Sequence, residues 1–222
     1  MTEVEWARLT AAQLNAQAGR DAIVIVPIGS TEQHGHHLPV QVDTRLVTEV
    51  ALAAARRMAP RHPTVVIPTI PYGMSEHHMS LGGTITLDYG AMAAVLGCAC
   101  RSLLRHGFRR LFNLNGHGGN TDGITTFVTE FTALHRVPLV SGTYWHIAAE
   151  EIAALLEKQT ALLHACEAET SLMLAVAPEL VDHDLLPQMH GTLVPGLAAI
   201  PGVNAGVYRW RQLGSRSLNG VI

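Results

Sequence analysis

The chain has 222 residues and a formal net charge of −3 with histidine counted as neutral. This length is sufficient for one sizeable hydrophobic core. The sequence has no basic tail and no run of Lys and Arg interleaved with aromatic residues, so we expect no nucleic-acid partner. It has no uninterrupted run of 18 apolar residues, so we expect no membrane-spanning helix. Glu3, Glu5 and Arg8 do not fit the pattern of a signal peptide.

The cysteines and the low charge indicate where the protein works and how it assembles. Cys98, Cys100 and Cys166 are too few for a disulfide framework, so we expect a reducing, cytoplasmic compartment. Only 15% of the residues are charged and 48% are hydrophobic. Part of the surface is then expected to be covered by self-association, which predicts a homo-oligomer.

Apolar runs alternate with stretches of helical periodicity along most of the chain. The expected strands cover residues 22–28, 64–70, 110–115 and 138–143. The expected helices cover residues 44–58 and 91–105, and a third runs from Asn120 to about His135. Asp43 and Asn120 are candidate helix caps. Strands that alternate with helices of this length predict parallel βαβ units in a layered α/β fold.

The sequence shows no internal repeat or linker, so we predict a single domain over residues 1–222. The tail from Pro187 to Ile222 is rich in Gly and Pro and is expected to form an extended loop region. It ends in apolar residues without a capping signal, which suggests that the natural chain continues.

The first cluster of polar residues follows the expected strand 22–28. Residues 29–39 read GSTEQHGHHLP, and Asp43 comes four residues later. Glu32 and His34 are two positions apart, so in an extended chain their side chains point the same way. Carboxylate and imidazole ligands together suit zinc, manganese or iron. Alternatively, Asp43 serves only as a helix cap.

The second cluster is the glycine-rich loop NGHGGN at residues 115–120, after the expected strand 110–115. Glycines on both sides of His117 permit a sharp turn that presents the imidazole at the strand end. A dinucleotide fingerprint is disfavoured because its third glycine would fall on Thr121. A loop that binds phosphate remains an alternative.

Two further segments carry candidate site residues. In residues 164–171, Glu167 and Glu169 cannot share one helical face, so at most one of them points inward. Both acids could instead favour a helix N-terminus through the helix dipole. Residues 72–78 form a polar loop that either faces a substrate or is simply solvated.

The two His/acid clusters together predict a metal site. Both follow expected parallel strands, whose carboxyl ends meet at one edge of a sheet. The sequence contains neither the G-x-S-x-G motif of serine hydrolases nor the H-E-x-x-H motif of zinc proteases.

In the order and spacing of these segments the chain resembles the creatininase family of metal-dependent amidohydrolases. The resemblance extends from Pro27 to about Pro178 and is strongest in the segment EQHG, with Leu38, Pro39 and Asp43. It implies a three-layer α/β/α fold with a mostly parallel central sheet and two divalent ions per chain, zinc and/or manganese or else iron. Because relatives are often hexamers, it also implies a homo-oligomer of that size.

The resemblance also implies roles for particular residues. Glu32 and His117 would bind one ion, His34 would bind the other, and Asp43 would bridge them. True creatininases have a glutamate where this chain has Gly119, so the second ion is assigned to Glu169 instead. His164 would carry a proton to the leaving nitrogen. Ser75 and His77 would contact substrate, and His36, which replaces the usual proline, would lie near the mouth of the site.

The implied reaction is hydrolysis of the C–N bond of a small amide, for example a cyclic amide such as creatinine, a formamide or a small peptide-like substrate. Gly119 argues against creatinine itself, because relatives with the glycine-type loop include a formamide-cleaving enzyme and a peptidase that matures a redox cofactor. The alternative is a non-catalytic sensor or assembly protein that binds a metal or small ligand. The intact set of Glu, His and Asp ligands disfavours that alternative.

Overall fold

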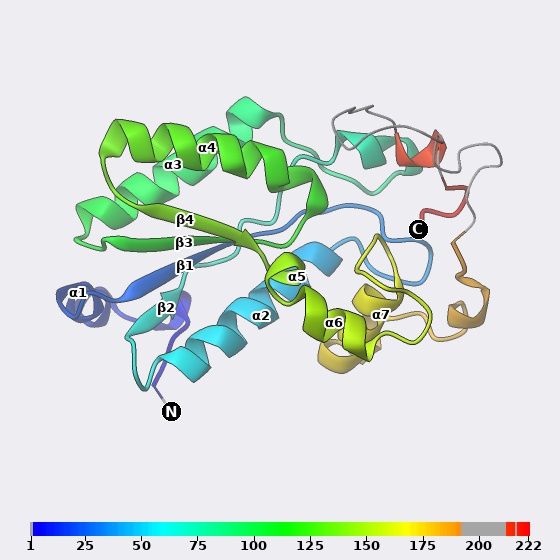
Figure 1. Ribbon diagram of the computed structural model, residues 1–222, viewed down its shortest axis with the longest axis horizontal. Helices are drawn as coiled ribbons and strands as arrows, with labels where there is room; N and C mark the ends of the chain where they lie inside the picture. Colours follow the sequence, from blue (N-terminus) through cyan, green and yellow to red (C-terminus); the bar gives the residue numbers. More distant parts are fainter. Residues whose placement is uncertain (1, 192–211, 216) are drawn as a thin grey trace. The chain divides into compact units, whose positions relative to one another are not determined.

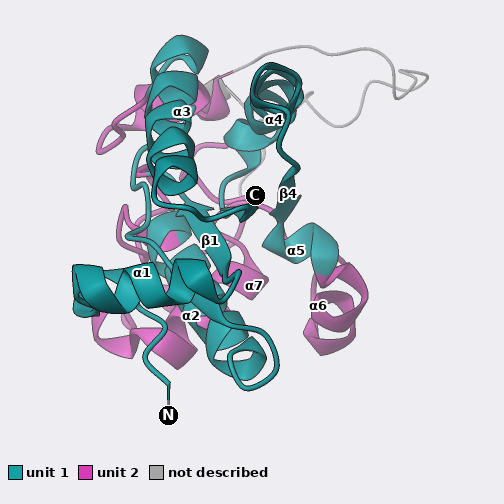
Figure 2. Ribbon diagram, turned by 90° about the vertical axis from the view of Figure 1, so that its left-hand side faces the viewer, with its two compact units in different colours: residues 1–30, 43–74, 87–147 teal, residues 31–42, 75–86, 148–222 magenta. Residues whose placement is uncertain are grey.

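The computed structural model describes residues 2–191, 212–215 and 217–222. The chain forms two compact units, which Figure 2 colours separately. Unit 1 consists of Met1–Ser30, Asp43–Met74 and Leu87–Ile147, and unit 2 consists of Thr31–Val42, Ser75–Thr86 and Ala148–Ile222.

Unit 1 is built on a sheet of four strands in the order β2-β1-β3-β4. The strands are β1 (Ile23–Ile28), β2 (Thr64–Val66), β3 (Arg110–Asn115) and β4 (Leu139–Thr143), and all three pairings are parallel. The helices α3 (Tyr89–Arg105) and α4 (Thr121–His135) cover one face, whereas α1 (Ala11–Gly19) and α2 (Val42–Met58) cover the other (Figure 1). This arrangement confirms the predicted α/β fold with a parallel central sheet between helices.

The core of unit 1 lies between the sheet and helices α3 and α4. Val24, Val26 and Ile28 alternate along β1 and are fully buried, as two-residue periodicity requires of one face of a strand. Leu96 of α3 and Phe127 of α4 pack into the same cluster. Burial on this scale fixes the strands, and therefore the positions at which their carboxyl ends present polar residues.

Two expectations about elements of unit 1 are corrected. The second strand stops at Val66, and its expected continuation to residue 70 is reduced to an isolated bridge between Ile28 and Ile70. Pro68 explains this, because proline cannot donate a hydrogen bond to a strand ladder. Helix α2 begins one residue before Asp43, so Asp43 lies in the first helical turn and is not the N-cap.

Unit 2 contains α6 (Ala149–Leu155), α7 (Glu167–Val176) and bridged loops, with isolated pairings between Thr31 and Ile85 and between His34 and Leu38. Its helix α7 carries the expected apolar stretch 172–176. A short helix α5 (Tyr144–Ile147) ends the last segment of unit 1. The short 3-10 helices of the described chain are Trp6–Arg8, Glu76–Leu81, Gly118–Asn120, Pro178–Leu180, Leu186–Gln188 and Leu213–Ser215.

Most of the expected loop at residues 187–222 lies outside the described residues. Its described part contains 3-10 turns, irregular chain and a single bridge residue, Ser217. Over the same described residues, none of the helices has the length and hydropathy needed to span a bilayer.

Candidate metal centre

Unit 1 contains a group of candidate metal ligands where β1 and β3 end. These strands finish side by side, with Ile28 paired to Asn115. His117 follows β3, and its Nδ1 lies 2.9 Å from Oδ2 of Asp43 in the first turn of α2. Both side chains are buried, and His117 Nε2 lies 3.2 Å from the carbonyl oxygen of Met74. One imidazole therefore links a backbone carbonyl to a buried carboxylate.

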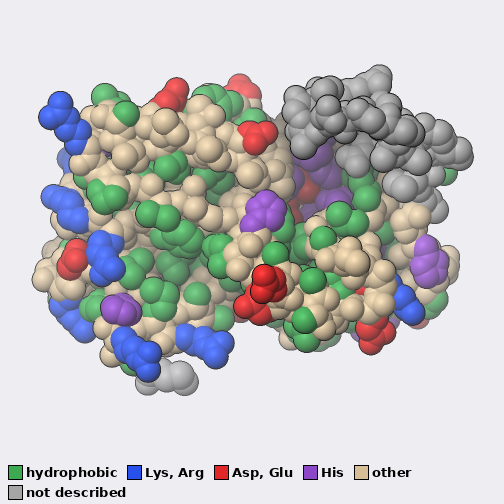
Figure 3. All heavy atoms as spheres, in the orientation of Figure 1, with side chains coloured by type: hydrophobic (Ala, Val, Ile, Leu, Met, Phe, Trp, Pro, Cys, Tyr) green, Lys and Arg blue, Asp and Glu red, His purple; other side chains and the backbone are tan. Residues whose placement is uncertain are grey.

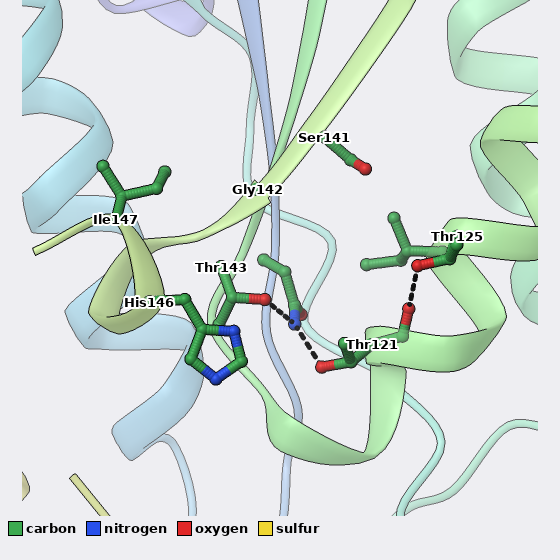
Figure 4. A pocket seen from close by; sticks show the side chains of 9 residues that line it. Thr121, Thr125, Ser141, Gly142, Thr143, His146 and Ile147 are labelled. Atoms are coloured by element: carbon green, nitrogen blue, oxygen red, sulfur yellow. Dashed lines mark hydrogen bonds between the residues drawn. The ribbon is translucent and has the colours of Figure 1, made fainter. Parts of the chain in front are cut away.

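The amide of Asn115 holds the His117 loop in place. Its Nδ2 donates to the carbonyl of His117 (2.8 Å) and to Oγ1 of Thr143 (3.1 Å), and its Oδ1 accepts the N–H of His117 (3.1 Å). Thr121 and Thr143 lie on either side of this amide at the rim of a cavity of about 320 Å³ (Figure 4). The loop is thereby fixed on both sides of its histidine.

Asn120 ties the same loop to two other segments. Its Nδ2 donates to the carbonyl of Gly29, and its Oδ1 accepts the N–H of Met74. Asn120 occupies the N-cap position of helix α4 as predicted, but its side chain makes no capping hydrogen bond. The amide instead joins the ends of β1 and β3 to residue 74.

Unit 2 contains its own group of candidate ligands, with two carboxylates and several imidazoles. Glu32, His34 and Glu169 are buried, and His34 Nε2 lies 3.8 Å from Glu169 Oε1. His34 Nδ1 lies 3.1 Å from the backbone oxygen of Glu32. Ligand atoms of Glu32, His34 and His164 lie within 4.8 Å of one another, a spacing that suits a metal ion.

Glu167 and Glu169 have different partners, as their spacing predicts. The carboxylate of Glu167 accepts the N–H groups of Glu157, Lys158 and Gln159 at 2.6–2.9 Å. These bonds, with that from Glu157 contributing most, lower the pKa of Glu167. Glu167 thus holds a loop, while Glu169 is the buried acid beside His34.

The remaining predicted residues occupy several environments. Ser75 is fully buried, His77 is partly buried with its ring 4.1 Å from that of His78, and His36 is exposed. His164 is 15% exposed, and its Nδ1 lies 3.6 Å from Glu32 Oε1. His164 is therefore the more accessible member of the cluster formed with Glu32 and His34.

Three buried residues near these groups were not identified from the sequence. The side chain of Gln33 is hydrogen-bonded to the rings of His78 and His164. His78 Nε2 lies 3.3 Å from Glu32 Oε1. His37 Nε2 bonds to Thr170, and burial lowers the pKa of His37. Gln33 and His37 lie in the segment 29–39, and His78 lies in the polar loop 72–78. Their roles were not visible in the sequence, because the residues they contact are distant along the chain.

The donor set fits divalent metal ions. Histidines that bind metals generally direct their second nitrogen to a backbone carbonyl or carboxylate, which fixes the ring. His117 and His34 both have this arrangement, with one nitrogen at a backbone oxygen and the other facing a carboxylate. Cys166, the cysteine nearest in sequence to these groups, is disfavoured as a nucleophile, because burial raises the pKa of its thiol.

The chain is similar to known proteins of one hydrolase family. The family model described as creatinine amidohydrolase matches residues 7–221. The chain is 33% identical over 183 residues to the creatinine amidohydrolase of Pseudomonas putida, covering 75% of this chain and 69% of that protein. It is 33% identical over 188 residues to the mycofactocin precursor peptide peptidase of Mycobacterium ulcerans, covering 82% and 69%. A solved manganese creatininase has a TM-score of 0.79 at 26% identity, covering 99% of this chain and 87% of that chain.

Proposed function

Because the chain belongs to the creatininase family of metal-dependent amidohydrolases, we propose that it hydrolyses the C–N bond of a small amide at a centre of two divalent ions. The observation that carries the proposal is the shared environment of His34 and His117. Each ring has one nitrogen at a backbone oxygen and the other facing a buried carboxylate, as metal-binding histidines do.

The proposed ligands are Glu32, His34, Asp43, His117 and Glu169. Their oxygen and nitrogen donors suit zinc or manganese, with iron as a further candidate, and one solved relative is a manganese creatininase. Bound divalent ions supply a water whose pKa falls towards about 7 and a Lewis acid for the amide carbonyl. The backbone oxygens at His34 and His117 keep both rings oriented.

His164 is the proposed carrier of a proton to the leaving nitrogen. Its ring belongs to the cluster of Glu32 and His34 but keeps some exposure, which gives a substrate access to it. Imidazole is suited to this task because its ordinary pKa lies near neutrality. Ser75, His77 and His36 are proposed to contact the substrate.

The proposed substrates are a formamide or a small peptide-like amide, with a cyclic amide such as creatinine as the alternative. A peptidase and a creatinine amidohydrolase are equally similar to this chain, at 33% identity each. Gly119 stands where creatininases have a metal-binding glutamate, which favours the formamide or peptide class. A screen of cyclic amides, formamides and short peptides with added manganese or zinc tests this choice.

The metal assignment is tested by elemental analysis of His117→Ala. The purified wild-type protein should carry close to two transition-metal ions per chain, and the variant should lose much of this metal while remaining folded. His62→Ala is the control, because His62 is exposed and lies outside the proposed site. A His117→Ala protein that retains its metal and activity would show that the assignment is wrong.

The proposed role of His164 is tested by separating binding from chemistry. His164→Ala should keep its metal and lose about 10²–10⁴-fold in kcat, the usual contribution of a general acid or base. An unchanged kcat would remove His164 from the mechanism.

We further propose that the protein assembles as a homo-oligomer, with a hexamer as the expected form. Hydrophobic side chains reach the surface on the face drawn in Figure 3. In unit 1 the exposed apolar residues include Leu134 (77% exposed), Val140 (56%) and Ile147 (63%). Covering such side chains is a common reason for self-association. Light scattering on the purified protein measures the subunit number, and a monomer would contradict this proposal.

A further inference from the structure

Four histidine rings of unit 2 lie in a row, each tilted by 41–57° to the next. The ring centres of His34 and His164 are 4.4 Å apart, those of His164 and His78 are 4.3 Å apart, and those of His78 and His77 are 4.1 Å apart. Gln33 lies beside the two middle rings and is buried. Its side chain is hydrogen-bonded to both rings. It therefore influences which nitrogen of each ring carries the hydrogen.

The orientation of the Gln33 amide follows from its hydrogen bonds. Its Oε1 accepts the N–H of Gly35 at 3.0 Å, which identifies the opposite end of the amide as the NH₂ group. That Nε2 lies 3.0 Å from Nδ1 of His78 and 3.0 Å from Nε2 of His164. An amide NH₂ donates two hydrogen bonds and accepts none, so both imidazole nitrogens must be acceptors.

The opposite ends of the two rings agree with this assignment. In a neutral imidazole, when one nitrogen accepts, the other carries the hydrogen. For His78 this is Nε2, which lies 3.3 Å from Glu32 Oε1, and for His164 it is Nδ1, which lies 3.6 Å from the same oxygen. A carboxylate oxygen is an acceptor, so Glu32 and Gln33 favour the same tautomer of each ring.

We propose that Gln33 is a positioning residue that fixes His164 as the Nδ1–H tautomer and thereby keeps it out of metal coordination. A histidine binds a metal through a lone pair, and Gln33 occupies the lone pair of Nε2 while Nδ1 bears a hydrogen. The ligand atoms of His164, Glu32 and His34 are close enough to hold an ion together. Gln33 therefore reserves for proton transfer a ring that would otherwise be a metal ligand, an inference that rests on the proposed function for the role of His164.

The test is nitrogen NMR of the full-length protein labelled with ¹⁵N-histidine, compared with Gln33→Glu. His164→Ala identifies the signals of His164. In the wild type, His164 should be protonated on Nδ1 and His78 on Nε2. A carboxylate at position 33 accepts a hydrogen bond where the amide donates one, so Gln33→Glu should move the hydrogen of His164 to Nε2 and free Nδ1 to bind metal.

Activity and metal content give a second readout. Gln33→Glu should lower kcat by about 10–100-fold, as the loss of an orienting partner commonly does, with KM nearly unchanged. Elemental analysis should find bound metal equal to or above the wild-type amount. Gln188→Glu is the matched control, since Gln188 is an exposed residue of the same unit and the change adds the same charge.

Two results would overturn the proposal. One is a wild-type His164 that is protonated on Nε2, a measurement that does not depend on whether any variant folds. The other is a folded Gln33→Glu protein with unchanged tautomers. Because the NMR signals require no turnover, a protein without amidase activity would contradict the proposed function while the tautomers still decide the role of Gln33.

Discussion

Replacing Gly29 with alanine should destabilise unit 1 and displace the turn that carries Asp43. A Cβ atom added at Gly29 would lie 2.6 Å from the backbone nitrogen and 2.7 Å from the Cα of Thr44. Ordinary contacts of this kind begin at 3.4 Å, so the first turn of α2 would have to move by about 0.8 Å. Both neighbours are backbone atoms, which cannot rotate away. Overpacking of this kind costs about 1–3 kcal/mol.

Urea unfolding of Gly29→Ala, the wild type and Gly19→Ala measures this cost. Gly19 ends helix α1 and has no atom within 4 Å of an added Cβ, so its variant should match or slightly exceed the wild-type stability. The expected loss for Gly29→Ala corresponds to a fall in Tm of about 2–12 °C, accompanied by a lower metal content. If Gly29→Ala unfolds within about 0.5 kcal/mol of the wild type, which is ordinary for a surface change, the close-approach reasoning is refuted.

Further expectations concern the His117 loop, the Glu167 carboxylate and the metal. Asn115→Ala should cost about 1–3 kcal/mol in urea unfolding, because it removes the acceptor of the buried His117 N–H and one of the two N–H donors to the His117 carbonyl; stability equal to the wild type would contradict this. The lowered pKa of Glu167 means that its contribution to stability is present above the ordinary value of 4.5 and is lost as pH falls through the folded-state pKa. Glu167→Gln should therefore differ from the wild type in unfolding near neutral pH and converge with it in acid, whereas parallel profiles would exclude this role. Chelation should abolish amide hydrolysis and added manganese or zinc should restore it, while activity that survives complete metal removal would contradict metal dependence.

Strands β1, β3 and β4 were predictable because each follows a short, mainly apolar run with clear boundaries, whereas the limit of β2 was not. Residues 110–115 form β3 with the expected limits, and β1 differs from its expected range by one residue. Helix α1 was not predicted, since its apolar pattern is weak and none of its residues is buried. Short 3-10 segments depend on turn contacts that leave little trace in periodicity.

The candidate site was predictable where neighbouring residues in sequence act together. Glu32 and His34 are two residues apart, a spacing that puts both side chains on the same side of an extended chain, and the glycines around His117 indicated a sharp turn. The contacts of Gln33 with His78 and His164 span 45 and 131 residues, so only the folded chain brings them together. Asn120 looked like a cap because its residue type favours that position, but tertiary hydrogen bonds use its amide elsewhere.

The fully buried amide of Asn120 has a consequence for attempts to redesign this enzyme. It joins the carbonyl of Gly29, the N–H of Met74 and the side chain of Asn115, which belong to three separate segments. These segments cannot be remodelled without cost, since displacing any of them removes a hydrogen-bond partner from the buried Asn120 amide. Directed evolution towards new amides should therefore tolerate few changes around Asn120 and find its productive variation among partly exposed positions such as His77.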